Sequence, residues 1–145
     1  PVTSAPEEAT PEAATPRVGE AGEALVIPEN AAERNDVSFM QGRWTSVTDL
    51  YNVDTGEQVV TEYEFDGSGQ GLSWIAETDQ RCATTATVRF EGETLHIVQN
   101  SEPKCPDGSI YHRSETSCRV SEGGRAICVT SQPNMEDIDV EMVRR

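Results

Sequence analysis

The sequence lacks a long hydrophobic run and has few basic side chains. Its 145 residues contain no apolar stretch of about 18 residues, the length that spans a bilayer, so no transmembrane helix is expected. Eleven Lys and Arg stand against 26 Asp and Glu, which gives a formal net charge of −15 at pH 7. Such a chain does not attract phosphate backbones or anionic lipid surfaces. We therefore expect no nucleic-acid partner and no membrane insertion by this chain.

Motifs for catalysis are also missing. The chain has no Gly-x-Ser-x-Gly nucleophile turn and no Cys-x-x-Cys pair. Its two histidines, His96 and His112, each lie beside apolar residues in an expected strand, which is typical of structural histidines. Alternating acids such as Glu62 and Glu64 resemble a glycosidase pair, but a solvated outer face of a strand accounts for them. We expect no enzyme and no cofactor.

One segment imitates a calcium-binding loop. Asp66, Ser68, Gln70 and Glu77 occupy positions one, three, five and twelve of an EF-hand loop. The flanking residues alternate as strands do, whereas an EF-hand needs helices there. The glycine-rich run at 66–71 predicts a hairpin turn instead, so we expect no metal site.

The composition changes near residue 36. Residues 1–36 are mostly Ala, Glu, Pro, Thr and Gly and contain no aromatic residue. Such a segment cannot bury enough surface to offset the entropy of ordering it. This predicts a disordered linker over 1–36, followed by one domain over 37–145. The apolar cluster Leu25-Val26-Ile27 is either part of a flexible end or a segment that docks on the domain or on a partner.

From residue 37 onward, apolar and polar side chains alternate with a period of two, which is typical of β-strands. Turns rich in Gly, Pro and Asp separate eight such segments. The expected strands are Gln41–Thr48, Gln58–Phe65, Leu72–Glu77, Ala83–Phe90, Thr94–Asn100, Ile110–Val120, Arg125–Thr130 and Asp137–Arg144.

The connections between these strands are short, which favours a sequential antiparallel meander. Closing the meander removes its two open edges, so we expect an all-β, eight-stranded antiparallel up-and-down barrel. An open β-sandwich is the alternative. The segment Glu33–Met40 would supply a turn of helix closing the barrel floor. The interior has room for side chains and at most one small ligand. The aromatic residues that would either line a ligand site or fill the interior include Trp44, Tyr63, Trp74 and Tyr111.

Four cysteines lie within the expected domain, at positions 82, 105, 118 and 128. An even number in a small domain predicts two disulfides, and hence an exported protein that is periplasmic, surface-attached or secreted. Counting residues back from the turns places Cys118 opposite Cys128 and Cys82 near Cys105. The predicted bonds are therefore Cys82–Cys105 and Cys118–Cys128.

The first expected strand opens with Gly42-Arg43-Trp44, and Arg144 lies near the end of the last strand. This pattern resembles the calycin superfamily, which includes lipocalins, avidins and small bacterial protease inhibitors. The resemblance covers 37–145 in architecture but only Gly42, Trp44 and Arg144 in motif, and the lipocalin Thr-Asp-Tyr signature is absent. It implies a structural cap in which Arg144 stacks on the Trp44 ring, worth about 1 kcal/mol.

A second resemblance rests on short stretches of the domain. The segments FMQGRW, YEFDGSGQG, CPDG, SCR and AIC are similar to the terminal domain of SrfA-type virulence factors of Gram-negative bacteria. This resemblance implies a virulence-associated exported protein but no particular activity.

These features together predict a non-catalytic extracytoplasmic binding or interaction module of a bacterial exported protein. Its partner would be an unknown protein or a small apolar or surface ligand. The alternative is a calycin-type protease inhibitor that acts through its N-terminal segment, and an enzyme is the third possibility.

Overall fold

The strands close into a barrel. A computed structural model describes residues 23–51, 58–76 and 81–145. Residues 1–22 of the expected linker at 1–36, most of the expected loop at 49–57, and Glu77 of the calcium-like loop lie outside them. Eight antiparallel strands pair in chain order, and β1 pairs with β8, with Trp44 opposite Arg144. This confirms the all-β up-and-down barrel and excludes the open sandwich.

The elements are the 3₁₀ turn η1 (Ser38–Met40), the 3₁₀ turn η2 (Glu122–Gly124) and the strands β1 (Gly42–Tyr51), β2 (Gln58–Phe65), β3 (Gln70–Ala76), β4 (Arg81–Glu91), β5 (Thr94–Gln99), β6 (Glu115–Val120), β7 (Ala126–Ser131) and β8 (Ile138–Arg144). η1 lies within the segment expected to hold a helical turn.

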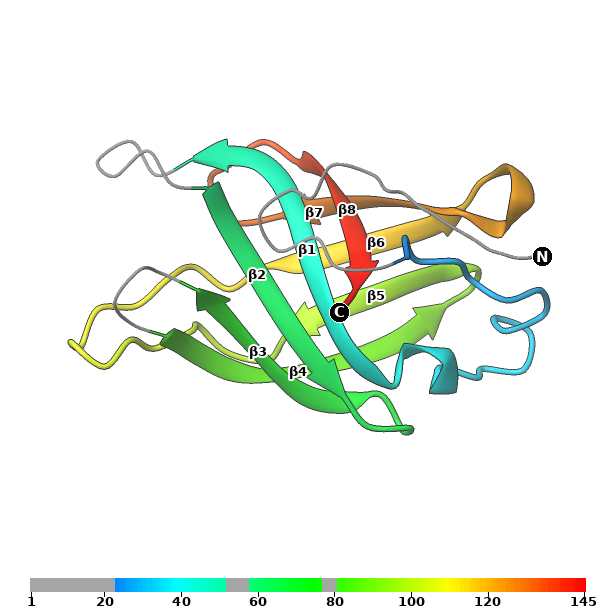
Figure 1. Ribbon diagram of the computed structural model, residues 1–145, viewed down its shortest axis with the longest axis horizontal. Helices are drawn as coiled ribbons and strands as arrows, with labels where there is room; N and C mark the ends of the chain where they lie inside the picture. The colour runs from blue at the N-terminus through cyan, green and yellow to red at the C-terminus, as the bar shows by residue number, and fades with distance from the viewer. Residues whose placement is uncertain (1–22, 52–57, 77–80) are drawn as a thin grey trace, which may run out of the picture.

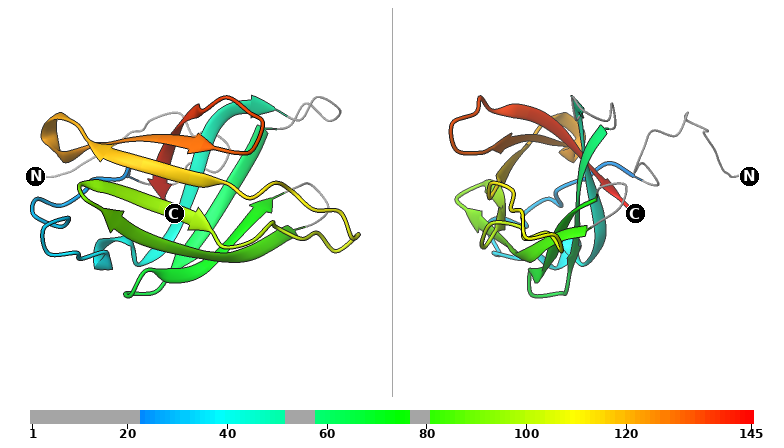
Figure 2. Two further views of the ribbon diagram at one scale, coloured as in Figure 1. Left: turned by 180° about the vertical axis from the view of Figure 1, so that it is seen from behind. Right: turned by 90° about the vertical axis from the view of Figure 1, so that its left-hand side faces the viewer.

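The two ends of the barrel differ (Figure 1). At one end, here called the closed end, lie η1, the N-terminal segment 23–36 and the tight turns after β2, β4 and β6. The opposite end, here called the open end, carries the long connection 100–114 and the β7–β8 connection. The second view in Figure 2 looks at the open end, where the strands form a ring.

The period-two pattern of the sequence sorts side chains between the inside and the outside of the barrel. Along β4, Cys82, Ala86 and Val88 are buried, whereas the intervening Thr85 and Arg89 are exposed. A two-residue turn at 92–93 fixes the next strand in register, so that Val88 lies opposite Ile97. Positive φ at Gly92 permits this tight turn.

One expected strand is shorter than its sequence pattern suggests. The run Ile110–Val120 alternates throughout, but β6 begins only at Glu115. Residues 103–111 instead fold back on themselves, with the Tyr111 N–H donating to the Pro103 carbonyl at 3.0 Å. The residue Lys104 bridges both to Ala83 of β4 and to Ile110, which holds the start of the expected strand away from the barrel wall.

The N-terminal segment completes the wall between β7 and β8. These strands pair only from Cys128 to Thr130, and they separate towards the closed end. Leu25 lies in that gap: its N–H donates to the Met142 carbonyl at 2.8 Å, and its carbonyl accepts from the Ala126 N–H at 3.1 Å. We call residues 23–27 the seam segment.

The seam segment moves the domain boundary towards the N-terminus. Leu25 and Ile27 are 2% and 3% exposed and belong, with Ala31, to the hydrophobic core. This confirms the interpretation in which the cluster at 25–27 docks on the domain, and it places part of the segment 23–36, which the composition assigns to the linker, on the barrel. Composition alone predicts disorder here because the segment is mostly polar. Three buried side chains nevertheless hold it, because the barrel supplies hydrogen-bond partners for its backbone groups.

Replacing Leu25 with alanine is expected to destabilise the domain by about 2–4 kcal/mol, because the cut side chain leaves a cavity in the core. The neighbouring Val26 is 51% exposed, so Val26→Ala serves as the matched control and should cost less than about 0.5 kcal/mol. Urea unfolding followed by tryptophan fluorescence measures both. Equal stability of the two variants would contradict the docking of this segment.

Candidate functional site

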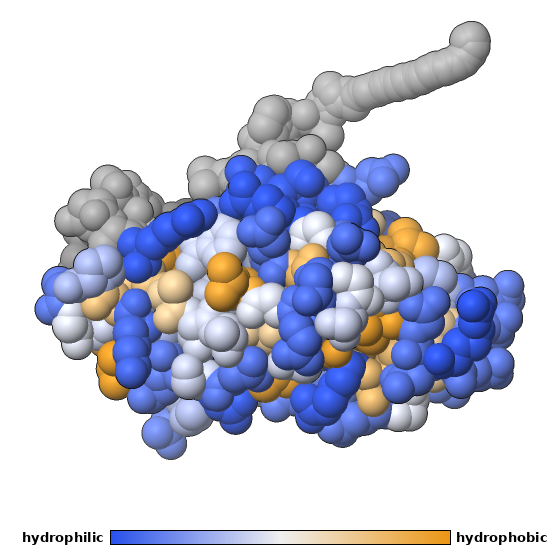
Figure 3. Space-filling view, turned by 90° about the horizontal axis from the view of Figure 1, so that it is seen from below, coloured by the Kyte–Doolittle hydropathy of each residue, from blue (hydrophilic) through white to orange (hydrophobic). Residues whose placement is uncertain are grey.

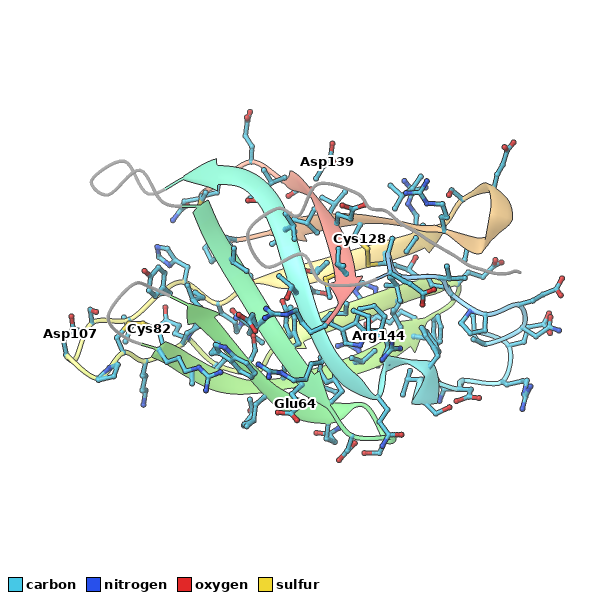
Figure 4. The ribbon with its side chains drawn as sticks, viewed as in Figure 1. Glu64, Cys82, Asp107, Cys128, Asp139 and Arg144 are labelled. Atoms are coloured by element: carbon cyan, nitrogen blue, oxygen red, sulfur yellow. A yellow bond between two sulfur atoms is a disulfide. The ribbon has the colours of Figure 1, made fainter. Side chains whose placement is uncertain are left out.

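The predicted cap is present at the closed end. The Arg144 guanidinium lies 4.2 Å from the centre of the Trp44 ring. Its two terminal nitrogens donate to the carbonyls of Gln41 and Phe39, each at 2.8 Å. The indole N–H of Trp44 donates to the Met40 carbonyl at 2.9 Å. The cap thus joins β8 to β1 and gives donors to the carbonyls of η1 and of Gln41, which follows it. Arg144 is labelled in Figure 4, near the end of β8.

Glycine is required before the capped tryptophan for two reasons. Gly42 has φ +114°, a conformation that side chains rarely adopt, and a Cβ there would lie 2.9 Å from an Arg144 nitrogen. The Gly-x-Trp spacing therefore bends the chain out of η1 and leaves room for the guanidinium. The same spacing directs Trp44 into the barrel and Arg43 outward.

The barrel interior is filled with side chains. Towards the closed end it is apolar: Leu95, Ile97 and Met142 are buried beneath Trp44. A void large enough for a water molecule would give the side chains around it accessible surface area. These side chains have almost no accessible surface area, so no water-sized void lies beside them. The described interior therefore contains packed core where a lipocalin-type pocket would lie.

Towards the open end the interior becomes polar. The Gln99 side chain, only 1% exposed, donates to the Ser73 hydroxyl at 3.1 Å and accepts from the Ser114 backbone N–H at 2.9 Å. The Thr116 and Thr130 hydroxyls lie 2.7 Å apart. These groups satisfy one another, so the network is a structural part of the core.

Tyr63 joins the apolar and polar halves. Its ring stacks on Phe65 with centroids 5.6 Å apart. Burial raises the pKa of its phenol, while hydrogen bonds from Thr116, Ser114 and Ser73 act in the opposite direction. The phenol therefore remains protonated at neutral pH and serves as a hydrogen-bonding group in the core.

The four aromatic residues expected to line a ligand site do not form one site. Trp44 and Tyr63 fill the interior. Trp74 points outward from β3, and Tyr111 packs on the small cluster of Ile75, Cys82 and Cys105. Their separation follows from the pleat, because Trp74 lies opposite Glu62 in the sheet while Ser73 faces inward beside Tyr63.

Two arginines enclose the outward tryptophan. Arg81 and Arg43 lie 4.2 and 5.3 Å from the centre of the Trp74 ring, which is only 5% exposed. With Leu72 they line a cavity of about 270 Å³ on the outer wall. Nearby, the Glu62 carboxylate accepts from Arg43 and lies 3.3 Å from Arg145. The strand register brings these residues together. The spacing of the arginines in the sequence did not reveal this cluster.

A cavity of about 580 Å³, lined by described residues, lies at the closed end. We call it the end groove. Its lining comes from the chain just after the seam segment, from the β4–β5 turn and from the end of β6. The lining residues are Val26, Ile27, Pro28, Glu29, Asn30, Ala32, Glu33, Glu93, Val120, Gly123 and Gly124. The sequence signalled only Val26 and Ile27, as part of an apolar cluster.

The groove gathers exposed hydrophobic side chains. Figure 3 shows one face of the molecule, on which hydrophobic side chains form small patches separated by hydrophilic ones. Among the described residues, six large hydrophobic side chains are about half exposed. Three of these, Val26, Val120 and Ile127, line the end groove or the adjacent groove between β7 and β8.

Both predicted disulfides form, Cys82–Cys105 and Cys118–Cys128. The second links directly opposed residues of β6 and β7 inside the barrel, and the first ties the loop 100–114 to β4 at the open end (Figure 4). Two intramolecular disulfides are compatible with an oxidising compartment.

The residues considered for metal binding or catalysis have structural partners. Asp66 accepts from the Ser68 N–H and hydroxyl and the Gln70 N–H, and these bonds, led by the Ser68 hydroxyl, lower its pKa. His96 lies on the outer wall, with Nδ1 2.8 Å from a Glu115 oxygen. In the described ranges no three His, Cys, Asp or Glu side chains are grouped to hold a metal ion. None of the described helices is long and apolar enough to cross a membrane.

Comparisons of the chain with protein-family models, with curated proteins and with solved structures give no significant match.

Proposed function

We propose that this chain is a non-catalytic binding module of an exported protein and that it binds a protein partner with the outer surface of the barrel. The packed interior carries this proposal. Side chains such as Gln99, Ile97 and Met142 occupy the space in which a barrel would carry a small apolar ligand. The described cavities lie on the outside wall or at the closed end, where they meet solvent.

We further propose that the module is calycin-like and extracytoplasmic. The contact between Trp44 and Arg144, on a closed barrel whose first strand begins at Gly42, supports the first part. The two disulfides support the second. A virulence-associated role follows from the resemblance to SrfA-type proteins and is proposed on that ground alone.

The alternative role as a protease inhibitor would require an N-terminal segment that is free to leave the barrel. An inhibitor of that kind inserts its segment into the protease cleft. Leu25 and Ile27 are held in the barrel wall by four main-chain hydrogen bonds that involve residues 23–27. An inhibitory segment would therefore have to precede residue 23.

Two measurements test the proposal on the oxidised protein. Titration with an apolar fluorescent probe, anilinonaphthalene sulfonate, should leave the amide NMR signals of interior residues such as Tyr63 and Gln99 unshifted, because the described interior side chains are packed. Photo-crosslinking from a benzophenone side chain placed at exposed Leu72 or Val120 should give a saturable product with a defined extracytoplasmic protein. Unlabelled folded domain should compete for that product.

A competitor of the same sequence distinguishes specific binding by the folded domain from nonspecific binding by unfolded chain. Domain that has been reduced and alkylated presents the same residues without the barrel, so it should not compete. A probe site among interior residues, or competition by reduced domain as strong as by folded domain, would overturn outer-surface recognition.

A further inference from the structure

The end groove combines an exposed apolar floor with a carboxylate rim. Its floor is aliphatic: Val26 and Val120 are 51% and 52% exposed, and Ile27, Pro28 and Ala32 lie beside them. A volume of about 580 Å³ lies within the range of protein sites that bury several side chains of a ligand. An aliphatic side chain bound there would remove water both from its own surface and from the floor of the groove.

The rim carries charge of one sign. Glu29 and Glu33 lie on one side, and Glu93, from the β4–β5 turn, lines the groove as well. None of the three is in an ion pair with another residue of the described part of the chain, and no Lys or Arg lines the groove. The basic residue Arg125, whose backbone pairs with Val26, lines the adjacent groove between β7 and β8.

We propose that the end groove binds an extended segment of a partner protein in which aliphatic residues are flanked by Lys or Arg. This inference rests on the proposed function and names the chemistry of its partner. The aliphatic side chains would cover Val26 and Val120, while the basic groups would face the free carboxylates. A second copy of this chain is a poor occupant, because it carries a net charge of −15 and presents the same acidic rim.

The seam segment builds this groove. The main-chain hydrogen bond from the Ile27 N–H to the Gly124 carbonyl, at 2.9 Å, places Val26 and Pro28 against the β6–β7 turn. Gly124 lies close to Val26 in the groove wall. Its φ is +84°, and a Cβ there would lie 3.3 Å from a Val26 methyl carbon. A larger residue there would narrow the groove.

Three peptides of one pattern test the proposal by amide NMR titration of the oxidised protein. They are Lys-Val-Leu-Lys-Val-Leu-Lys and its counterparts with Glu or Ser in place of every Lys, all with blocked ends. The Lys peptide should shift amides of residues 26–33 and 120–124 and bind at least about five-fold more tightly than the Ser peptide, with the advantage falling as salt rises. The Glu peptide should bind most weakly.

Variants separate the groove from the rest of the surface. Glu93→Lys and Val120→Ser should each weaken binding of the Lys peptide by at least about three-fold. The matched controls, Glu136→Lys and Ile110→Ser, change the same kinds of exposed side chain elsewhere and should leave it unchanged. All four positions are exposed, so thermal unfolding should confirm that each variant folds.

The outcomes distinguish the two proposals. Equal binding of the Lys and Ser peptides, shifts confined to another part of the outer wall, or no binding at about millimolar peptide would overturn the groove's specificity and leave outer-surface recognition standing. Shifts centred on interior residues such as Tyr63 and Gln99 would overturn both.

Discussion

Trp44→Ala is expected to lower the free energy of unfolding by about 3–5 kcal/mol, a large part of the total for a domain of this size. The change empties the core beneath the cap, removes the donor to the Met40 carbonyl and leaves the Arg144 guanidinium without its ring. Urea unfolding monitored by far-ultraviolet circular dichroism measures the loss. Trp44→Phe, which keeps a ring without the N–H, should retain a folded barrel and cost less.

Arg144→Ala should cost about 1–3 kcal/mol, because it removes two charge-assisted hydrogen bonds as well as the stacking on the indole. Arg119 is exposed on β6, so Arg119→Ala is the matched control and should change stability by less than about 0.5 kcal/mol. The double variant at positions 44 and 144 should lose less than the sum of the single losses. Coupling below about 0.3 kcal/mol would contradict a cap that joins the first and last strands.

Reduction of the two disulfides is expected to destabilise the domain by about 2–4 kcal/mol for each bond. The combined loss approaches the whole stability of a small domain, so the reduced protein should melt at a much lower temperature. Thermal unfolding with and without a phosphine reductant measures the change. An unchanged melting temperature under full reduction would contradict it.

Paired alanine substitutions separate the contributions of the two bonds. Cys82 and Cys105 are 23 residues apart, whereas Cys118 and Cys128 are 10 apart. In the chain-entropy description the longer loop gives the larger stabilisation, by about 0.7 kcal/mol. Both pairs are buried, so cavity costs are similar and loop length should decide the order. Peptide mapping of the oxidised protein should recover these two pairs, and a fragment joining Cys82 to Cys118 would contradict the connectivity.

The barrel, the cap and the disulfides could be predicted because each depends on local periodicity and on counting residues. Alternation fixed which side chains face inward, and short turns set the register that placed Cys118 opposite Cys128. The contact of Trp44 with Arg144 followed once β1 and β8 were taken as neighbours. The last of these inferences needed only the closure of the barrel, which brings the two ends of the meander together.

The docking of Leu25 was one of two interpretations of its apolar cluster, but neither the place where it docks nor the groove beside it could be predicted in this way. Their partners lie at the far end of the chain, around Gly124 and Met142, and no repeating pattern connects such distant positions. A polar composition correctly indicates that residues 23–36 would not fold alone. It does not show that a gap between two strands will accept one leucine. The start of β6 was misplaced for a similar reason, since the contact of Lys104 with β4 overrides a good strand pattern.

The seam segment also sets the order of events during folding. Leu25 needs the carbonyl of Met142 and the N–H of Ala126, and Arg144 binds the Phe39 carbonyl 105 residues earlier in the chain. The closed end therefore cannot form until β8 has emerged from the ribosome. Contacts between such distant residues make folding slow, because the loop must close before they form. All four cysteines precede β8 in the chain, so they have already emerged by the time the closed end forms.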